Sequence, residues 1–185
     1  MKEKGTGDAA GEGRADAAGA GELTRTLVVG ATGMLARLVR ALAEEGDDVT
    51  VLARRACTGG GQVQSLTVDY RNTEALEPAL KRAGLFDRMV AWIHSDAPEA
   101  SETIRRHVLG DVLHVLGSAA TDPGLPAHIP AAGEPREVIL GFVRDGGHFR
   151  WLTDAEISTG VLAALRSGEP RSVVGRVMPW SDRPR

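Results

Sequence analysis

The chain has 185 residues, a length that suits a single domain with a sizeable hydrophobic core. Its formal net charge of −3 gives no support for nucleic-acid binding or for attraction to a membrane surface. Cys57 is its one cysteine, which excludes an intrachain disulfide and makes a cysteine-based metal site unexpected. No apolar run approaches the roughly 20 residues of a membrane-spanning helix, so we expect a cytoplasmic protein.

Residues 1–22 have the composition of a disordered tail. They contain six glycines and six alanines, and no large apolar residue follows Met1. Such a segment cannot bury enough apolar surface to offset the loss of chain entropy on folding. We therefore predict a Gly/Ala-rich disordered tail over residues 1–22, with an interaction arm as the alternative, and one folded domain over residues 23–185.

Apolar periodicity predicts alternating strands and helices in the first half of the domain. A short buried strand is expected at 27–29, and further strands at 49–52 and 63–68. A helix between the first two strands ends near Gly46 and has five apolar residues on one face, namely Met34, Leu35, Leu38, Val39 and Leu42. A second helix is expected at 73–83.

The second half of the domain continues this alternation. Strands are predicted at 89–93, 112–116, 138–143 and 172–177, and a helix at 98–109. Residues 119–135 contain four prolines and are expected to form a loop. The run Thr153-Asp154-Ala155-Glu156 is a capping box that begins a last helix. The fold class predicted is α/β, a Rossmann-type doubly wound and mostly parallel sheet of about seven strands in a single domain.

The turn between the first strand and the first helix has the spacing of a nucleotide-binding loop. Gly30, Gly33 and Ala36 form the pattern G-x-x-G-x-x-A. Gly30 permits the tight turn, Gly33 lets the backbone approach a pyrophosphate at the helix N-terminus, and Ala36 lets the helix pack close to the sheet. Thr32 and Met34 belong to the same segment and are further candidates for cofactor contact. The alternative is a tight turn without a ligand.

The second strand ends in two arginines, Arg54 and Arg55. An acidic residue at this position would hold the ribose 2′-hydroxyl of NAD, whereas an arginine favours the 2′-phosphate of NADP. A guanidinium also matches phosphate with two parallel hydrogen bonds. The sequence therefore predicts NADP(H) in preference to NAD(H), and two solvated surface arginines are the alternative.

The stretch TLVVGATGMLARLVRAL followed by VTVLARR resembles the start of the short-chain dehydrogenase/reductase superfamily. The resemblance implies that Asp69, followed by Tyr70, meets the adenine of the cofactor. It also places the end of the fifth strand, Leu116-Gly117-Ser118, where the family has its catalytic serine. The runs VGATGML, VDY, VAWIHS, ILGFV, RWLT and EISTGV, within residues 26–180, resemble a smaller, atypical bacterial group in which no reaction is established.

The chain departs from the superfamily in its catalytic motif. Conventional members have Tyr-x-x-x-Lys shortly after the serine, but the one tyrosine here is Tyr70 and no lysine follows Lys81. The proline-rich segment 119–135 occupies the place of the helix that would carry the motif. The resemblance therefore implies a fold and a cofactor class, and leaves the substrate and the proton donor open.

Three residues are candidates to replace the missing acid, because each follows a predicted strand. His94 could act as a general acid, or else hydrogen-bond the cofactor or a loop carbonyl. Ser118 could bind a substrate carbonyl, or else cap a turn. His148 follows Gly146-Gly147 in an expected mobile loop, whereas His114 lies within a strand and is expected to be a hydrogen-bonded core residue. No spaced ligand cluster suggests a metal site.

Two functions are compatible with these features. The first is an atypical NADP-dependent oxidoreductase that acts on a small organic substrate, which the sequence does not identify. The second is a non-catalytic NADP(H)-binding sensor or regulatory protein, which the missing Tyr-x-x-x-Lys motif favours. A homo-oligomer remains open, because the usual dimer helices of the superfamily are partly missing.

Overall fold

The computed structural model describes residues 23–57, 62–126 and 128–184, so the predicted tail over residues 1–22 lies outside the described residues. Seven strands form one sheet: β1 (Arg25–Val29), β2 (Asp48–Ala53), β3 (Val63–Thr67), β4 (Phe86–Ala91), β5 (Val108–Gly117), β6 (Arg136–Leu140) and β9 (Arg171–Val174). Four α-helices accompany it: α1 (Ala36–Glu44), α2 (Thr73–Ala83), α3 (Pro98–Arg105) and α4 (Asp154–Ser167). Strands β7 (Phe142–Asp145) and β8 (His148–Trp151) form a separate hairpin, and η1 (Ser118–Thr121) and η2 (Trp180–Asp182) are short 3₁₀ turns.

The sheet has the strand order β3-β2-β1-β4-β5-β6-β9, and every neighbouring pair is parallel. The order reverses between β1 and β4, which is the topological switch point where open α/β sheets bind ligands. The predicted α/β Rossmann-type fold in a single domain is thereby confirmed.

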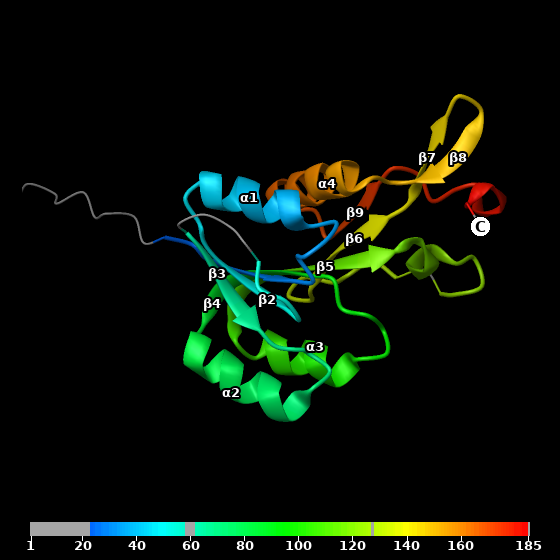
Figure 1. Ribbon diagram of the computed structural model, residues 1–185. Coiled ribbons are helices and arrows are strands. Elements are labelled where there is room, and N and C mark those ends of the chain that lie inside the picture. Colours follow the sequence, from blue (N-terminus) through cyan, green and yellow to red (C-terminus); the bar gives the residue numbers. More distant parts are fainter. Residues whose placement is uncertain (1–22, 58–61, 127, 185) are drawn as a thin grey trace, which may run out of the picture.

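Helices cover both faces of the sheet. Helices α1 and α4 lie side by side on one face, and α2 and α3 lie on the other (Figure 1). Strand residues alternate between these two layers, so that Val28 packs toward α1 and α4 while Leu27 and Val29 pack toward α2 and α3. All three side chains are fully buried. Burial on both faces explains why the central strands are continuous apolar runs.

The predicted end of the third helix and the predicted start of the fifth strand are both wrong, because two backbone segments approach each other closely there. The helix predicted at 98–109 ends at Arg105, and strand β5 already begins at Val108. A Cβ atom added to Gly110 would lie 2.4 Å from the carbonyl oxygen of Asp87, so the glycine allows the two backbones to meet. The pairing register of β4 and β5 shifts at this point, between Phe86 and Arg88.

The strand predicted at 138–143 is two strands. Chain direction changes at Gly141, where an added Cβ atom would lie 2.0 Å from the carbonyl oxygen of Arg176. The chain leaves the sheet there and forms the β7–β8 hairpin, which extends beyond the sheet (Figure 1). Gly146 and Gly147 have φ angles of +55° and +95°, which suits a two-residue hairpin turn. The expected mobile loop is therefore the turn of a hairpin.

The proline-rich segment 119–135 crosses the sheet without a regular helix or strand, apart from η1 and within the residues that the structure describes. Arg171 of β9 fastens it by donating hydrogen bonds to the carbonyl oxygens of Ala120 and His128. Pro130, within this segment, is buried. A fastened loop thus stands where the superfamily resemblance would place a helix.

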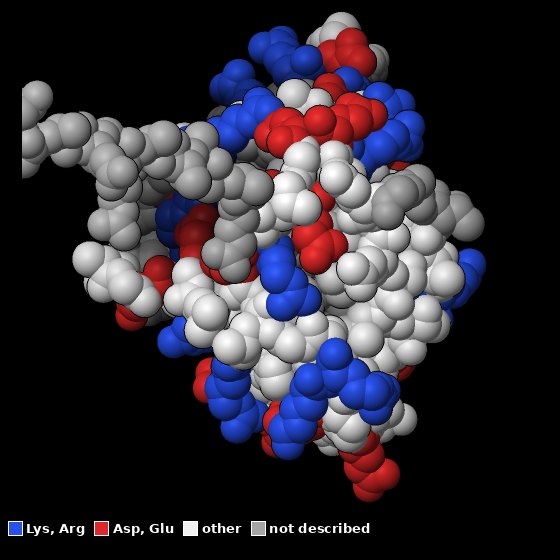
Figure 2. All heavy atoms as spheres, turned by 90° about the vertical axis from the view of Figure 1, so that its left-hand side faces the viewer, with Lys and Arg blue, Asp and Glu red and all other residues white. Residues whose placement is uncertain are grey.

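Ion pairs gather at the amino ends of the strands. Thr26, Asp47 and Arg88 form a largely buried network there, in which Arg88 Nε donates to Thr26 Oγ1 at 2.8 Å. Positive and negative side chains are interspersed on this side of the molecule (Figure 2). The carboxyl ends of the strands lie at the opposite edge and carry the candidate site.

Candidate functional site

Gly30 shapes the exit from strand β1. It has a φ angle of +80°, and an added Cβ atom would lie 2.9 Å from the carbonyl oxygen of Trp92. Its amide donates to the carbonyl oxygen of Leu52 at 3.2 Å, which continues the pairing with β2. Glycine is needed here both for the left-handed backbone and for the contact with β4.

Gly33 has no comparable structural duty. It has no positive φ angle, and an added Cβ atom would meet no atom of the described chain within 4 Å. The backbone amides of Thr32, Gly33 and Met34 have no hydrogen-bond acceptor among the described residues. A turn with open space and free amides before a helix is the arrangement that holds a pyrophosphate. The residues present therefore fit a dinucleotide.

The turn is longer than the sequence indicated. Helix α1 begins at Ala36, so Met34 and Leu35 belong to the turn. The Ser158 hydroxyl donates a 2.6 Å hydrogen bond to the carbonyl oxygen of Met34, which ties the turn to helix α4. Ser158 is buried. Sequence reasoning missed this residue because a serine inside an amphipathic helix gives no signal of such a distant contact.

Arg54 and Arg55 follow β2 and are exposed. Neither forms an ion pair with any described residue. This contrasts with the paired charges at the amino ends, and leaves both guanidinium groups available to a ligand.

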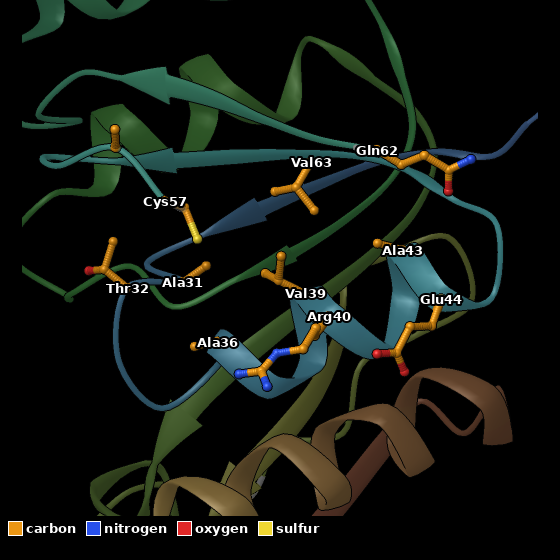
Figure 3. A pocket seen from close by; sticks show the side chains of 11 residues that line it. Ala31, Thr32, Ala36, Val39, Arg40, Ala43, Glu44, Cys57, Gln62 and Val63 are labelled. Carbon is orange, nitrogen blue, oxygen red and sulfur yellow. The ribbon is translucent and has the colours of Figure 1, made fainter. Parts of the chain in front are cut away.

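A cavity of about 530 Å³ is lined by the turn after β1, by helix α1 and by residues that follow β2. Thr32 and Ala31 of the turn line it together with Cys57, which follows the two arginines (Figure 3). Arg40 extends from α1 on the opposite side and brings a further cation close to the turn. The arginine was not a sequence candidate, although its place one turn after Ala36 on the helix was available as a signal.

Asp69 and Tyr70 follow β3 at the same edge. The Asp69 carboxylate accepts a hydrogen bond from the backbone amide of Arg71 at 3.0 Å and is half-buried. Tyr70 packs partly against the core, with the Arg71 guanidinium 5.0 Å from its ring centre. Arg71 also pairs with Asp96 after β4, and this hydrogen bond raises the arginine pKa above its ordinary value. These contacts connect the segment after β3 with the segment after β4.

Ser118 lies at the other side of the switch point, in a cavity of about 270 Å³. It is buried, and it begins η1 directly after β5. Trp92, Gly141 and Trp151 line the same cavity, as does Arg183 from the C-terminal segment. The cavity therefore joins the ends of β4, β5 and β6 to the base of the hairpin.

The other two catalytic candidates lie elsewhere. His94 lines a separate cavity of about 450 Å³ beside α3, and its ring meets the edge of Trp92 at 5.9 Å between ring centres. His148 is exposed next to the turn of the β7–β8 hairpin. The structure thus brings Ser118 together with Trp92, but does not place the two histidines in the cavity that Ser118 lines.

The prediction that His114 is a hydrogen-bonded core residue is wrong. Its Nε2 atom is buried and has no hydrogen-bond partner among the described residues. Burial lowers the pKa of the imidazole below its ordinary value, and the charge of Arg105 lowers it further. His114 is also one of the residues that line the cavity beside α3.

Among the described residues, no group of three or more His, Cys, Asp or Glu side chains could hold a metal ion. In the same part of the chain, no helix has the length and apolar character needed to cross a bilayer.

Solved structures that share the fold include several short-chain dehydrogenases. One from Burkholderia cenocepacia J2315, in complex with NADP, is 18% identical with a TM-score of 0.63, over 84% of this chain and 89% of its own. A short-chain dehydrogenase/reductase from Serratia marcescens BCRC 10948 is 21% identical with a TM-score of 0.56, over 81% and 94% of the two chains. A short chain dehydrogenase from Bacillus anthracis is 14% identical with a TM-score of 0.57, over 82% and 95%.

No protein-family model and no curated protein matches the sequence. At such low identities the structural likeness establishes a fold and leaves the reaction undetermined. The resemblance to an atypical bacterial group stays a prediction. What the strand order, the turn at Gly30–Gly33 and these neighbours establish together is that the chain has the Rossmann fold of the short-chain dehydrogenase/reductases.

Proposed function

We propose that this chain binds NADP(H) at the carboxyl edge of its sheet and acts as an oxidoreductase on a small organic substrate. The observation that carries the proposal is the open space at Gly33, next to backbone amides without acceptors in the described chain. Gly30, Thr32, Met34 and Ala36 would complete the pyrophosphate side of the site. The printed description of the Burkholderia neighbour as an NADP complex supports the cofactor class.

Selectivity for the 2′-phosphate would rest on cations at the end of β2. Arg54 and Arg55 are exposed and unpaired within the described chain, and no acidic residue stands at that position to hold a ribose hydroxyl. Arg40 adds positive charge beside the same turn. Asp69 and Tyr70 would bound the adenine.

The chemistry proposed is hydride transfer, which the bound nicotinamide supplies. Reduction of a carbonyl adds the hydride to carbon and a proton to oxygen, so the protein must polarise the oxygen and deliver the proton. Ser118 lies in the cavity at the ends of β4, β5 and β6 and would hydrogen-bond that oxygen. With no Tyr-x-x-x-Lys motif, the proton would come from Ser118, from His94 after side-chain movement, or from water.

A non-catalytic NADP(H) sensor is the second candidate. It is favoured by the separation of Ser118 from His94 and His148, which lie outside the cavity that Ser118 lines. Mixing NADPH-loaded protein with carbonyl, imine and enone compounds, and following absorbance, separates the two. Oxidation that Ser118→Ala abolishes supports the enzyme, whereas tight binding without oxidation across the panel supports the sensor.

Arg54→Asp tests the cofactor assignment. Removing a cation and adding a carboxylate should weaken NADPH binding by about tenfold or more and improve NADH binding, because a phosphate is then repelled and a ribose hydroxyl is accepted. Calorimetric titration of both cofactors measures the shift, and Arg82→Asp on the exposed surface of α2 is the matched control. If the unmodified protein bound NADPH and NADH with equal affinity, the proposal that Arg54 selects the 2′-phosphate would be wrong.

A further inference from the structure

The C-terminal segment contributes an arginine to the cavity that holds Ser118. After β9 the chain returns through η2, and Arg183 lines the cavity together with Trp92 and Trp151. Its guanidinium lies 5.4 Å from the ring centre of Trp151 and 4.9 Å from that of Trp180. Two aromatic rings thus hold the planar cation in place.

The charge of Arg183 is not neutralised by the described residues. Its Nε atom is buried and has no hydrogen-bond partner among them, and no ion pair there includes it. The cavity lining contains no carboxylate, so Arg183 is its one charged residue. A partly buried cation without a counter-ion is costly unless a ligand supplies the opposite charge.

We infer that Arg183 binds a carboxylate of the substrate, and that the substrate class is a small 2-oxo acid or the corresponding 2-hydroxy acid. The inference rests on the proposed function. A guanidinium donates two parallel hydrogen bonds to a carboxylate, and the two terminal nitrogens of Arg183 would supply them. The cavity of about 270 Å³ suits a small molecule, and Ser118 in its wall would meet the neighbouring carbonyl oxygen.

The reaction balances without a further reagent. In the reducing direction the carbonyl carbon would gain a hydride from NADPH and the oxygen would gain a proton from solvent, directly or through Ser118, which would give the 2-hydroxy acid and NADP⁺. Arg183 would hold the carboxylate throughout and take no proton. It is therefore a specificity-determining residue, and its contribution should appear in substrate binding.

Binding can be measured without turnover, because the chain has three tryptophans and all of them surround Arg183 or its cavity. Pyruvate, 2-oxobutanoate and 2-oxopentanoate are titrated into the full chain, with and without NADP⁺, by calorimetry and by tryptophan fluorescence. The methyl ester of each acid keeps the 2-oxo carbonyl without the charge and is larger by one methyl group. We expect at least one acid to bind about tenfold or more tightly than its ester.

Arg183→Gln should abolish this preference for the acid, since it removes the charge. Arg183→Lys keeps the positive charge and should therefore retain part of the preference for the acid over the ester. That result would assign the loss in Arg183→Gln to the missing charge and not to misfolding. Arg176→Gln is the matched control, because Arg176 is exposed in the same segment and lines none of the described cavities. Acid binding should be unchanged there.

Other outcomes overturn the inference. They are binding of acid and ester with equal affinity, undiminished acid binding by Arg183→Gln, or no binding by any of the three acids. A loss of NADP⁺ affinity in Arg183→Gln without any acid binding would assign the arginine to the cofactor instead. If NADPH fails to bind the unmodified protein while the acids still bind at Arg183, the proposed function fails and the anion site stands.

Discussion

At the scale of single residues, two glycines of one turn have different physical duties. Gly30 is required by the fold, since its φ angle is positive and an added Cβ atom would lie 2.9 Å from the Trp92 carbonyl oxygen. Gly33 faces space that no atom of the described chain fills. The sequence pattern predicted both roles, but only the structure separates the glycine that the backbone requires from the one that we propose faces the cofactor.

Alanine at Gly30 and valine at Gly33 should therefore have opposite effects. Gly30→Ala is expected to lower the free energy of unfolding by about 1–3 kcal/mol, because the backbone is strained and the added carbon meets a carbonyl oxygen. Gly33→Val should change it by less than about 0.5 kcal/mol, yet weaken NADPH binding at least about tenfold by filling the pyrophosphate space. Urea unfolding and fluorescence titration measure the two quantities. A Gly33→Val protein that binds NADPH normally would show that the open space serves no ligand.

At the scale of elements, the sequence predicted what local chemistry determines. The capping box is present as expected, with Thr153 Oγ1 accepting from the Glu156 amide and the Glu156 carboxylate accepting from the Thr153 amide at 2.8 Å. The capping box therefore predicted the first residue of α4 correctly. Helix α2 also has its predicted bounds.

Contacts between distant segments account for the errors. Gly110 and Gly141 looked like ordinary residues of a helix end and a strand, but each allows a close approach of backbone from another part of the chain. Arg183 gave no signal at all, since nothing in a polar segment after the last strand shows that it folds back over the cavity at Ser118. Gly146-Gly147 did carry a hairpin signal that was interpreted as a mobile loop.

The hairpin is joined to α4 by Arg150, which donates hydrogen bonds to both carboxylate oxygens of Glu156. Those bonds, with the Thr153 bonds, lower the pKa of Glu156 from an ordinary 4.5 to about 2. Because the carboxyl pKa is lower in the folded protein than in the unfolded chain, ionised Glu156 stabilises the fold at pH values above about 4.5. This contribution is lost as the pH falls from about 4.5 through about 2. Lowering the pH through this window therefore destabilises the folded protein.

Glu156→Gln should flatten the dependence of the melting temperature on pH within that window, because the amide keeps the capping hydrogen bond but has no charge to lose. Circular dichroism melts across the window measure this. Glu74→Gln is the control, since Glu74 also lies in the first turn of a helix and forms no ion pair with a described residue. The idea would be abandoned if the two variants showed the same pH dependence as the unmodified protein.

At the scale of the whole molecule, the two edges of the sheet have different electrostatic organisation. Several charges at the amino edge are paired, as in the network of Thr26, Asp47 and Arg88. At the carboxyl edge Arg71 pairs with Asp96, but Arg54, Arg55 and Arg183 have no ion pair within the described chain. We interpret the buried network at the amino edge as structural and the unpaired arginines of the carboxyl edge as functional, which agrees with the rule that open α/β sheets bind ligands at the carboxyl ends of their strands.

Arg88→Met tests this division of roles. The change leaves the Asp47 carboxylate buried with only Thr26 as a partner, and should lower the free energy of unfolding by about 3 kcal/mol. Asp47→Ala with Arg88→Met should recover part of that loss, because no unpaired charge then remains buried. Arg82→Met, on the exposed surface of α2, should stay within about 0.5 kcal/mol of the unmodified protein.

The affinity for NADPH tests whether the cofactor binds at the carboxyl edge of the sheet, independently of the network at the amino edge. Under conditions where Arg88→Met is folded, its NADPH dissociation constant should match that of the unmodified protein, because the network lies at the edge opposite the turn at Gly33. Arg54→Asp should show the reverse pattern, with normal stability and weakened NADPH binding. If Arg88→Met weakened the cofactor as much as Arg54→Asp did while remaining folded, the two edges would be coupled and the separation of a structural edge from a binding edge would be wrong.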